Sequence, residues 1–200
     1  MNSTRPRSTH TVEHKPPAFA VWITGLPASG KSTIASALRD QLTSREIDVA
    51  VLESDTLRRI LTPSPRYDEE ERENFYRAMV YVGVLLTEHG VPVIFDATAN
   101  RRAYRDEARE QISRFLEVFV DCPLEVCIRR DCKGTYRKAQ EGTATIVPGL
   151  QVPYEVPENA DVIIRGDVET PEAAARKIVS ILLEKKFITG DRATPRETHK

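Results

Sequence analysis

The chain has 200 residues, of which 40% are hydrophobic and 30% are charged, which suffices for one compact domain and is too short for two of ordinary size. Its 29 basic residues nearly balance 30 acidic ones, giving a formal net charge of -1. No overall positive field therefore favours binding to nucleic acid or to an anionic membrane, and any anion site must be local.

Membrane and secretory signals are missing from the sequence. No apolar stretch approaches the roughly 18 residues of a membrane span, and residues 1–17 lack the apolar centre of a secretory signal. The three cysteines, Cys122, Cys127 and Cys132, have a number and spacing that complete neither a zinc site nor a disulfide framework. We expect reduced thiols and a cytoplasmic protein.

Residues 1–17 and 188–200 lack apolar periodicity and are expected to be flexible tails around a domain spanning residues 18–187. Within the domain, short apolar runs alternate with longer segments of helical spacing, which is typical of a parallel sheet covered by helices. In chain order we expect a strand at 19–24, a helix at 31–43, strand 48–52, helix 69–89, strand 91–95, helix 101–114, strand 116–120, helix 124–130, strand 161–164 and helix 171–186. In the helix at 69–89, helical spacing predicts that the core rather than a dimer seam receives Phe75, Met79, Val82, Leu85 and Leu86.

The most informative segment matches the phosphate-loop pattern G-x-x-x-x-G-K-[ST] between a predicted strand and a predicted helix. It consists of Gly25, Leu26, Pro27, Ala28, Ser29, Gly30, Lys31 and Ser32, followed by Thr33. Its glycines let successive N–H groups point at phosphates, Lys31 would bridge the β- and γ-phosphates, and Ser32 would coordinate Mg²⁺. The alternative is a glycine turn with an exposed lysine. The pattern predicts a three-layer α/β fold of the P-loop NTPase type that binds a nucleoside triphosphate and Mg²⁺, and the five apolar runs predict a mainly parallel five-stranded sheet.

A carboxylate pair and arginines follow the second predicted strand. Asp55 could accept the proton of an acceptor hydroxyl or hold metal-bound water, and Arg58 could grip an anionic group. Ligands of open α/β sheets bind at this edge. The alternative is a helix start with an acid near its positive end and surface arginines.

A further acid, Asp96, ends the third predicted strand, where P-loop proteins often place a metal-ordering carboxylate; the alternative is a cap for the next turn. Arg101, Arg102 and Arg105 recur on one side of the following helix start, where they meet either phosphate or solvent. The guanine-reading run Asn-Lys-x-Asp is missing, which favours a phosphotransferase or a nucleotide-sensing module over a switch GTPase.

Later segments carry a family resemblance. FVDCPLEVC at 119–127, RDCKGTYRKA at 130–139 and PGLQVPYEVPE at 148–158 resemble stretches of the adenylylsulfate kinases, and the likeness spans about residues 19–183. It implies ATP-dependent phosphorylation of the 3′-hydroxyl of adenosine 5′-phosphosulfate (APS) in sulfate assimilation. Among partners we expect this small-molecule substrate and no nucleic acid, with a homodimer as an option that the sequence leaves open. The resemblance also implies that Arg130 and the Cys127 region line the ATP adenine and that residues 133–142 form a lid over the phosphates. On the acceptor side it implies Arg58 and Arg72 at the anionic end, Tyr67 stacked on the adenine, and Thr98 and Arg101 in the loop after the third strand.

Departures from this pattern concern the acceptor. Thr56 replaces an asparagine, the run at 75–77 reads FYR instead of N-I-R, and the run at 146–150 loses an aromatic residue. Thr98 replaces a serine sometimes described as a phosphorylated intermediate; we expect direct in-line transfer, which needs only the loop, metal and base. The alternatives are a related kinase acting on another small-molecule or nucleic-acid-end hydroxyl, and a noncatalytic nucleotide-sensing module.

Overall fold

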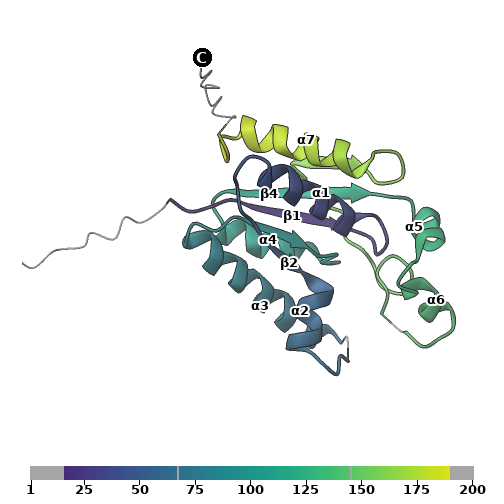
Figure 1. Cartoon of the computed structure of the whole chain (residues 1–200). Coiled ribbons are helices and arrows are strands. Elements are labelled where there is room, and N and C mark those ends of the chain that lie inside the picture. Colours follow the sequence, from purple (N-terminus) through teal and green to yellow (C-terminus); the bar gives the residue numbers. More distant parts are fainter. Residues whose placement is uncertain (1–15, 67, 145, 190–200) are drawn as a thin grey trace, which may run out of the picture.

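A five-stranded parallel sheet lies at the centre of the computed structural model, which describes residues 16–66, 68–144 and 146–189. The strand order is β2-β3-β1-β4-β5, so the first strand lies in the middle. Helices cover both faces (Figure 1), which confirms the predicted three-layer α/β fold. The predicted tails lie almost entirely outside the described residues.

All five predicted strands and all five predicted helices are present, with small shifts of their ends. The strands are β1 (Ala20–Gly25), β2 (Ala50–Glu53), β3 (Val93–Asp96), β4 (Phe115–Asp121) and β5 (Val162–Arg165). The helices are α1 (Lys31–Thr43), α2 (Ser54–Leu61), α3 (Glu69–Glu88), α4 (Arg102–Gln111), α5 (Leu124–Arg130), α6 (Thr135–Gln140) and α7 (Pro171–Glu184). The two short helices α2 and α6 were not among the predicted elements.

Alternation along β1 divides the core into two halves. Val21 and Ile23 point toward α1 and α7, whereas Trp22 points toward α3 and α4 and stacks on Phe95 with ring centroids 4.5 Å apart. All of these side chains are buried, and each contributes about 1.5–3 kcal/mol by leaving water. Ile188, one residue beyond the predicted end of the domain, is buried in the first half.

The core face of α3 differs from the prediction. Phe75 and Met79 are buried, but Leu85 is 45% exposed, so its assignment to the core was wrong. The buried seam continues from Met79 through Val80 and Gly83 to Thr87, which turns Leu85 toward solvent. Val82 and Leu86 pack against the core while partly exposed.

Residues at the helix starts explain where α3 and α7 begin. The Asp68 side chain accepts a hydrogen bond from the Glu71 N–H at 2.9 Å, and the Thr170 hydroxyl accepts one from the Ala173 N–H at 3.2 Å. These caps satisfy N–H groups that have no partner within the helix. None of the helices in the described part of the chain is long and apolar enough to cross a membrane.

Candidate active site

The predicted phosphate loop joins β1 to α1 at the carboxyl edge of the sheet. A Cβ on Gly25 would lie 2.6 Å from the Val120 carbonyl oxygen, so this position admits only glycine. Gly30, directly before α1, has φ +105° in the left-handed region, which glycine adopts without a Cβ penalty. Between them, Ala28 also has a positive φ of 58°. The loop therefore curls immediately before the positive end of a long helix, as an anion cradle requires.

The Lys31 side chain lies inside the curved phosphate loop. It is buried, and its Nζ donates to the Leu26 carbonyl oxygen at 2.9 Å, across the loop. Burial lowers the pKa of Lys31, and the nearby carboxylates of Asp96 and Asp55 offset part of this effect. An ammonium in such a place attracts a phosphate strongly, because little water screens it.

Asp96 lies beside the loop because β3 pairs with β1 in the register that sets Asp96 opposite Ile23. It is buried, and burial raises the pKa of its carboxyl group, while Lys31 and a hydrogen bond with the Ser32 hydroxyl act in the opposite direction. The structure thus brings together three predicted groups, an ammonium, a hydroxyl and a carboxyl, at one edge of the sheet.

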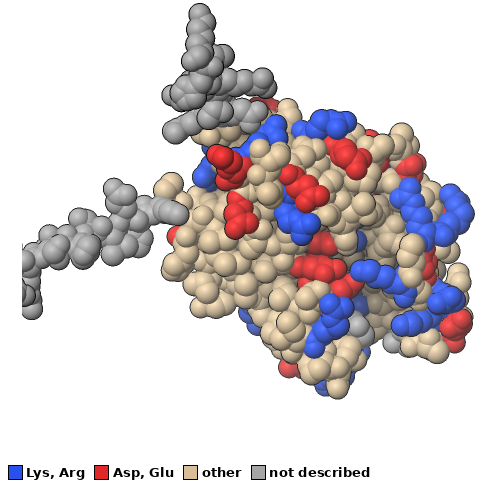
Figure 2. Space-filling model, viewed as in Figure 1, with Lys and Arg blue, Asp and Glu red and all other residues tan. Residues whose placement is uncertain are grey.

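Asp55, in the first turn of α2, is exposed and faces the segment that leads into α6. Its Oδ2 accepts from Lys133 Nζ at 2.6 Å, and this contact raises the pKa of Lys133. The Tyr136 hydroxyl of α6 donates to the Pro27 carbonyl oxygen at 3.0 Å. The predicted lid segment therefore contacts both the phosphate loop and α2. Lys and Arg side chains gather over α5 and α6 in Figure 2, close to acidic residues of the same face.

The arginines predicted to hold the acceptor all have protein partners. Arg58 pairs with Glu71 at 3.3 Å and lies 3.9 Å above the centre of the Phe75 ring. Arg72 donates to the side-chain oxygen of Asn100 at 3.1 Å and to the Ile146 carbonyl at 2.6 Å, and Arg101 pairs with Glu69 at 2.6 Å. Thr98 lies in the loop after β3, and Tyr67 lies outside the described residues.

Arg130 reaches from the end of α5 to the turn after β5. Its Nη1 donates to the Gly166 carbonyl oxygen at 2.7 Å, and a Cβ on Gly166 would come within 2.7 Å of the Ser29 carbonyl. The guanidinium therefore lies close to the phosphate loop. The three cysteines are free, and burial raises the pKa of the Cys127 thiol to about 12, so this thiol stays protonated.

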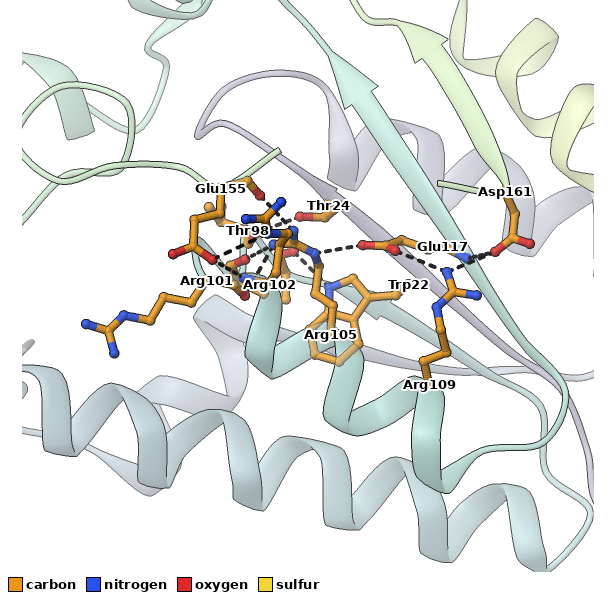
Figure 3. A network of polar contacts seen from close by, with 12 residues as sticks. Trp22, Thr24, Thr98, Arg101, Arg102, Arg105, Arg109, Glu117, Glu155 and Asp161 are labelled. Carbon is orange, nitrogen blue, oxygen red and sulfur yellow. Dashed lines mark hydrogen bonds and ion pairs between the residues drawn. The ribbon is translucent and has the colours of Figure 1, made fainter. Parts of the chain in front are cut away.

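A buried polar network beside this edge was missed by sequence reasoning (Figure 3). Arg105, expected to meet phosphate or solvent, does neither: it is 1% exposed and its Nε donates to Glu117 of β4 at 2.7 Å. Arg109 donates to the other Glu117 oxygen at 3.1 Å and to Asp161 at 3.2 Å. No local pattern in the polar sequence of α4 marks Arg105 as buried.

Comparison with known proteins gives a consistent result. The profile of the adenylylsulphate kinase family matches residues 17–165. The adenylyl-sulfate kinase of Microcystis aeruginosa is 40% identical over 168 residues, which cover 84% of this chain and 93% of that protein. The adenylyl-sulfate kinase of a Picosynechococcus species is 38% identical over 178 residues, covering 89% of this chain and 99% of that protein.

Among solved structures, the APS kinase CysC of Mycobacterium tuberculosis, in complex with AMPPNP and APS, superposes with a TM-score of 0.79. It is 32% identical in sequence, and the match covers 84% of this chain and 99% of that one. Fold, phosphate loop and sequence thus agree, and the chain belongs to the adenylylsulphate kinase family.

Proposed function

We propose that this chain transfers the γ-phosphoryl group of ATP to the 3′-hydroxyl of adenosine 5′-phosphosulfate, giving 3′-phosphoadenosine 5′-phosphosulfate for sulfate assimilation. The observation that carries the proposal is the meeting of Lys31, Ser32 and Asp96 at the edge of the sheet, in a chain whose family match spans residues 17–165. We also propose that the protein acts in the cytoplasm, as expected from the sequence, because its phosphoryl donor would be ATP.

The donor half is assigned to the phosphate loop. Backbone N–H groups of residues 25–33 hold the phosphates, Lys31 bridges the β- and γ-phosphates, and Arg130 lines the nucleobase. A Mg²⁺ ion would be held by Ser32 and Asp96 together with the phosphates, because Mg²⁺ prefers oxygen ligands and often takes only one or two from the protein. A site made by the protein alone is a different matter: no group of three or more His, Cys, Asp or Glu side chains among the described residues could hold a metal. The phosphates would therefore supply part of the Mg²⁺ coordination. When bound there, the ion would supply positive charge against the charge on the transferred group.

The acceptor half is assigned to α2, α3 and the loop after β3. Asp55, also predicted as a metal contact, lies three residues before Arg58 on α2 and therefore on the same face. We assign Asp55 to the acceptor hydroxyl: it takes the proton as the hydroxyl oxygen bonds to the γ-phosphorus and the bond to the bridging oxygen of ADP breaks. Arg58 and Arg72 hold the anionic end, while Tyr67, Thr98 and Arg101 complete the pocket.

A second candidate is another hydroxyl acceptor, and two observations favour it. Thr56, which replaces an asparagine of the family pattern, has no side-chain amide, and its hydroxyl donates to Glu53 at 2.6 Å. Phe75, at the start of the altered run, is buried beneath Arg58 and offers no amide to an acceptor.

The test is an assay of the purified chain with MgATP and adenosine 5′-phosphosulfate, in which chromatography quantifies the 3′-phosphorylated product and ADP. The Lys31→Ala variant is the control. The proposal is supported if the wild-type chain forms product and ADP in equal amounts and the Lys31→Ala variant forms neither. Phosphorylation of a different hydroxyl compound in a parallel panel identifies the second candidate, and tight ATP binding without any transfer identifies a nucleotide-sensing module.

For partners, we propose a small-molecule substrate, no nucleic acid, and a homodimer. Large apolar side chains are exposed on neighbouring helices, with Ile60 of α2 70% exposed and Tyr81 of α3 66% exposed. Light scattering coupled to gel filtration measures the mass in solution. A mass of about 22.6 kDa would identify a monomer and reject the homodimer.

A further inference from the structure

The guanidinium of Arg105 connects three parts of the structure. Besides its bond to Glu117 of β4, its Nη1 donates to the carbonyl oxygens of Ala99 and Arg101, and its Nη2 donates to the Glu155 carbonyl at 2.7 Å. Figure 3 shows this side chain between the loop and the strand. A buried guanidinium is costly to desolvate, and here all its nitrogens are satisfied, so its position is strongly determined.

The carbonyl groups of the loop after β3 are held, mostly by buried side chains, and so is the N–H of Ala99. The bonds run from Trp22 Nε1 to Ala97 O (3.2 Å), from Thr24 Oγ1 to Thr98 O (2.6 Å), from Ala99 N to the Tyr76 hydroxyl (3.0 Å), and from Glu155 N to Asn100 O (2.8 Å). This loop is therefore set by side chains from β1, α3 and α4, not by regular secondary structure.

Ala99 shows that this arrangement is imposed on the loop. Its φ of +40° lies in the left-handed region, which a residue with a Cβ adopts only at a cost, and it is fully buried. Such a conformation persists when the surroundings over-determine it. Tyr76 holds its N–H and Arg105 holds its carbonyl, so both adjoining peptide groups are fixed.

The same loop carries the groups assigned to the phosphoryl acceptor. Thr98 and Arg101 belong to it, and Asn100 accepts from Arg72 at 3.1 Å while donating to the Pro153 carbonyl at 3.2 Å. We propose that Arg105 is a positioning residue for the acceptor: it fixes the loop at 97–101 against the segment at 153–155, and thereby the places of Thr98, Arg101 and Arg72. This inference rests on the proposed function.

The matched control is on the same helix. Arg109 shares Glu117 with Arg105, but its other bond goes to Asp161 instead of the loop. Lysine at either position keeps the charge and removes the planar fork. We expect Arg105→Lys to raise KM for the acceptor about tenfold or more, with KM for ATP within about twofold, and Arg109→Lys to change both by less than about twofold. Equal changes of the acceptor KM in the two variants would overturn the proposal.

A second measurement is independent of the substrate. Hydrogen exchange at the Ala99 and Glu155 amides should be at least about tenfold faster in Arg105→Lys and unchanged in Arg109→Lys. Adding Ala99→Gly to Arg105→Lys should recover part of the acceptor KM, because glycine adopts the left-handed conformation without the Cβ penalty. Unchanged exchange in Arg105→Lys, or no recovery on adding Ala99→Gly, would refute the assigned role.

The proposed function and the positioning role of Arg105 can be refuted independently of each other. If the wild-type chain transfers no phosphate to adenosine 5′-phosphosulfate but exchange responds as expected, the proposed function falls and the role of Arg105 in fixing the loop stands. If Arg105→Lys does not fold, Glu117→Gln replaces it, since this change keeps the side-chain shape and removes the anchoring charge. Faster Ala99 exchange and a raised acceptor KM support the proposal, and no change in either overturns it.

Discussion

Gly83 lies in the middle of α3, where an added methyl group would collide with a side chain of the core. A Cβ at this position would lie 2.1 Å from Phe95 Cζ and 2.7 Å from its Cε1, whereas carbon atoms normally keep about 3.5–4.0 Å. The ring cannot retreat freely, because Phe95 is fully buried and stacks on Trp22 at 4.5 Å. The helix and β3 must therefore separate by about 1.5 Å to restore a normal contact.

Two opposing terms set the size of the effect of Gly83→Ala. Overpacking of this kind costs about 1–3 kcal/mol, and alanine gains about 1 kcal/mol over glycine inside a helix. We expect a net loss of about 1–2 kcal/mol in the free energy of unfolding, since the separation required is more than one methyl group can absorb. For a domain of this size the loss corresponds to a Tm lower by about 2–8 °C.

Urea unfolding followed by fluorescence is a direct assay, because Trp22 is the single tryptophan and belongs to the affected stack. In a Phe95→Leu background the ring atoms are gone, so Gly83→Ala should become neutral or stabilising there. An increase in stability of about 1 kcal/mol in the wild-type background, the full helix-propensity gain, would refute the steric reasoning. So would identical effects of Gly83→Ala in the two backgrounds.

Three further changes test the site and its supports. Lys31→Ala should lower kcat by about 10³-fold or more while the chain stays folded, because the buried ammonium acts mainly on the transition state; kcat and the urea midpoint check this, and near wild-type turnover would contradict it. Asp96→Asn should stabilise the ligand-free chain at pH 7 while abolishing activity. The raised pKa means that the folded state binds this proton more tightly than the unfolded chain, so wild-type stability falls as pH rises through that pKa, and the gain should shrink toward pH 4; a gain that is the same at both pH values would contradict it. Thr170→Ala should cost about 1 kcal/mol through the lost cap of α7, and no change in the urea midpoint would rule that out.

The phosphate loop was predictable because its determinants are contiguous. Gly25, Gly30 and Lys31 lie within seven residues, and the apolar run before them and the helical spacing after them specify their surroundings. The five strands were predictable for a similar reason, since each contains a short apolar run; β1 and β3 are buried along their whole length, whereas β2 and β5 are exposed in part.

The pairing of Arg105 with Glu117 could not be predicted in this way. Arg105 lies in a polar segment that locally suits solvent, whereas Glu117 is a single acid within the apolar run of β4; only the packing of α4 against β4 shows that the two pair in the interior. The contact of Asp55 with Lys133 likewise joins residues 78 positions apart. The helix α2 was foreseen only as an alternative because it is just eight residues long; Leu57, Ile60 and Leu61 have helical spacing, but none of its residues is buried.

The central place of β1 has a consequence for biosynthesis. Its neighbours are β3 and β4, and β2 pairs with β3 alone, so no two strands present in the first 92 residues can pair with each other. During translation, the apolar β1 therefore has no strand to pair with until β3, which ends at Asp96, has left the ribosome. Exposed apolar strands of this kind are prone to aggregate, so the topology places the aggregation risk of the nascent chain in the interval between the synthesis of β1 and that of β3.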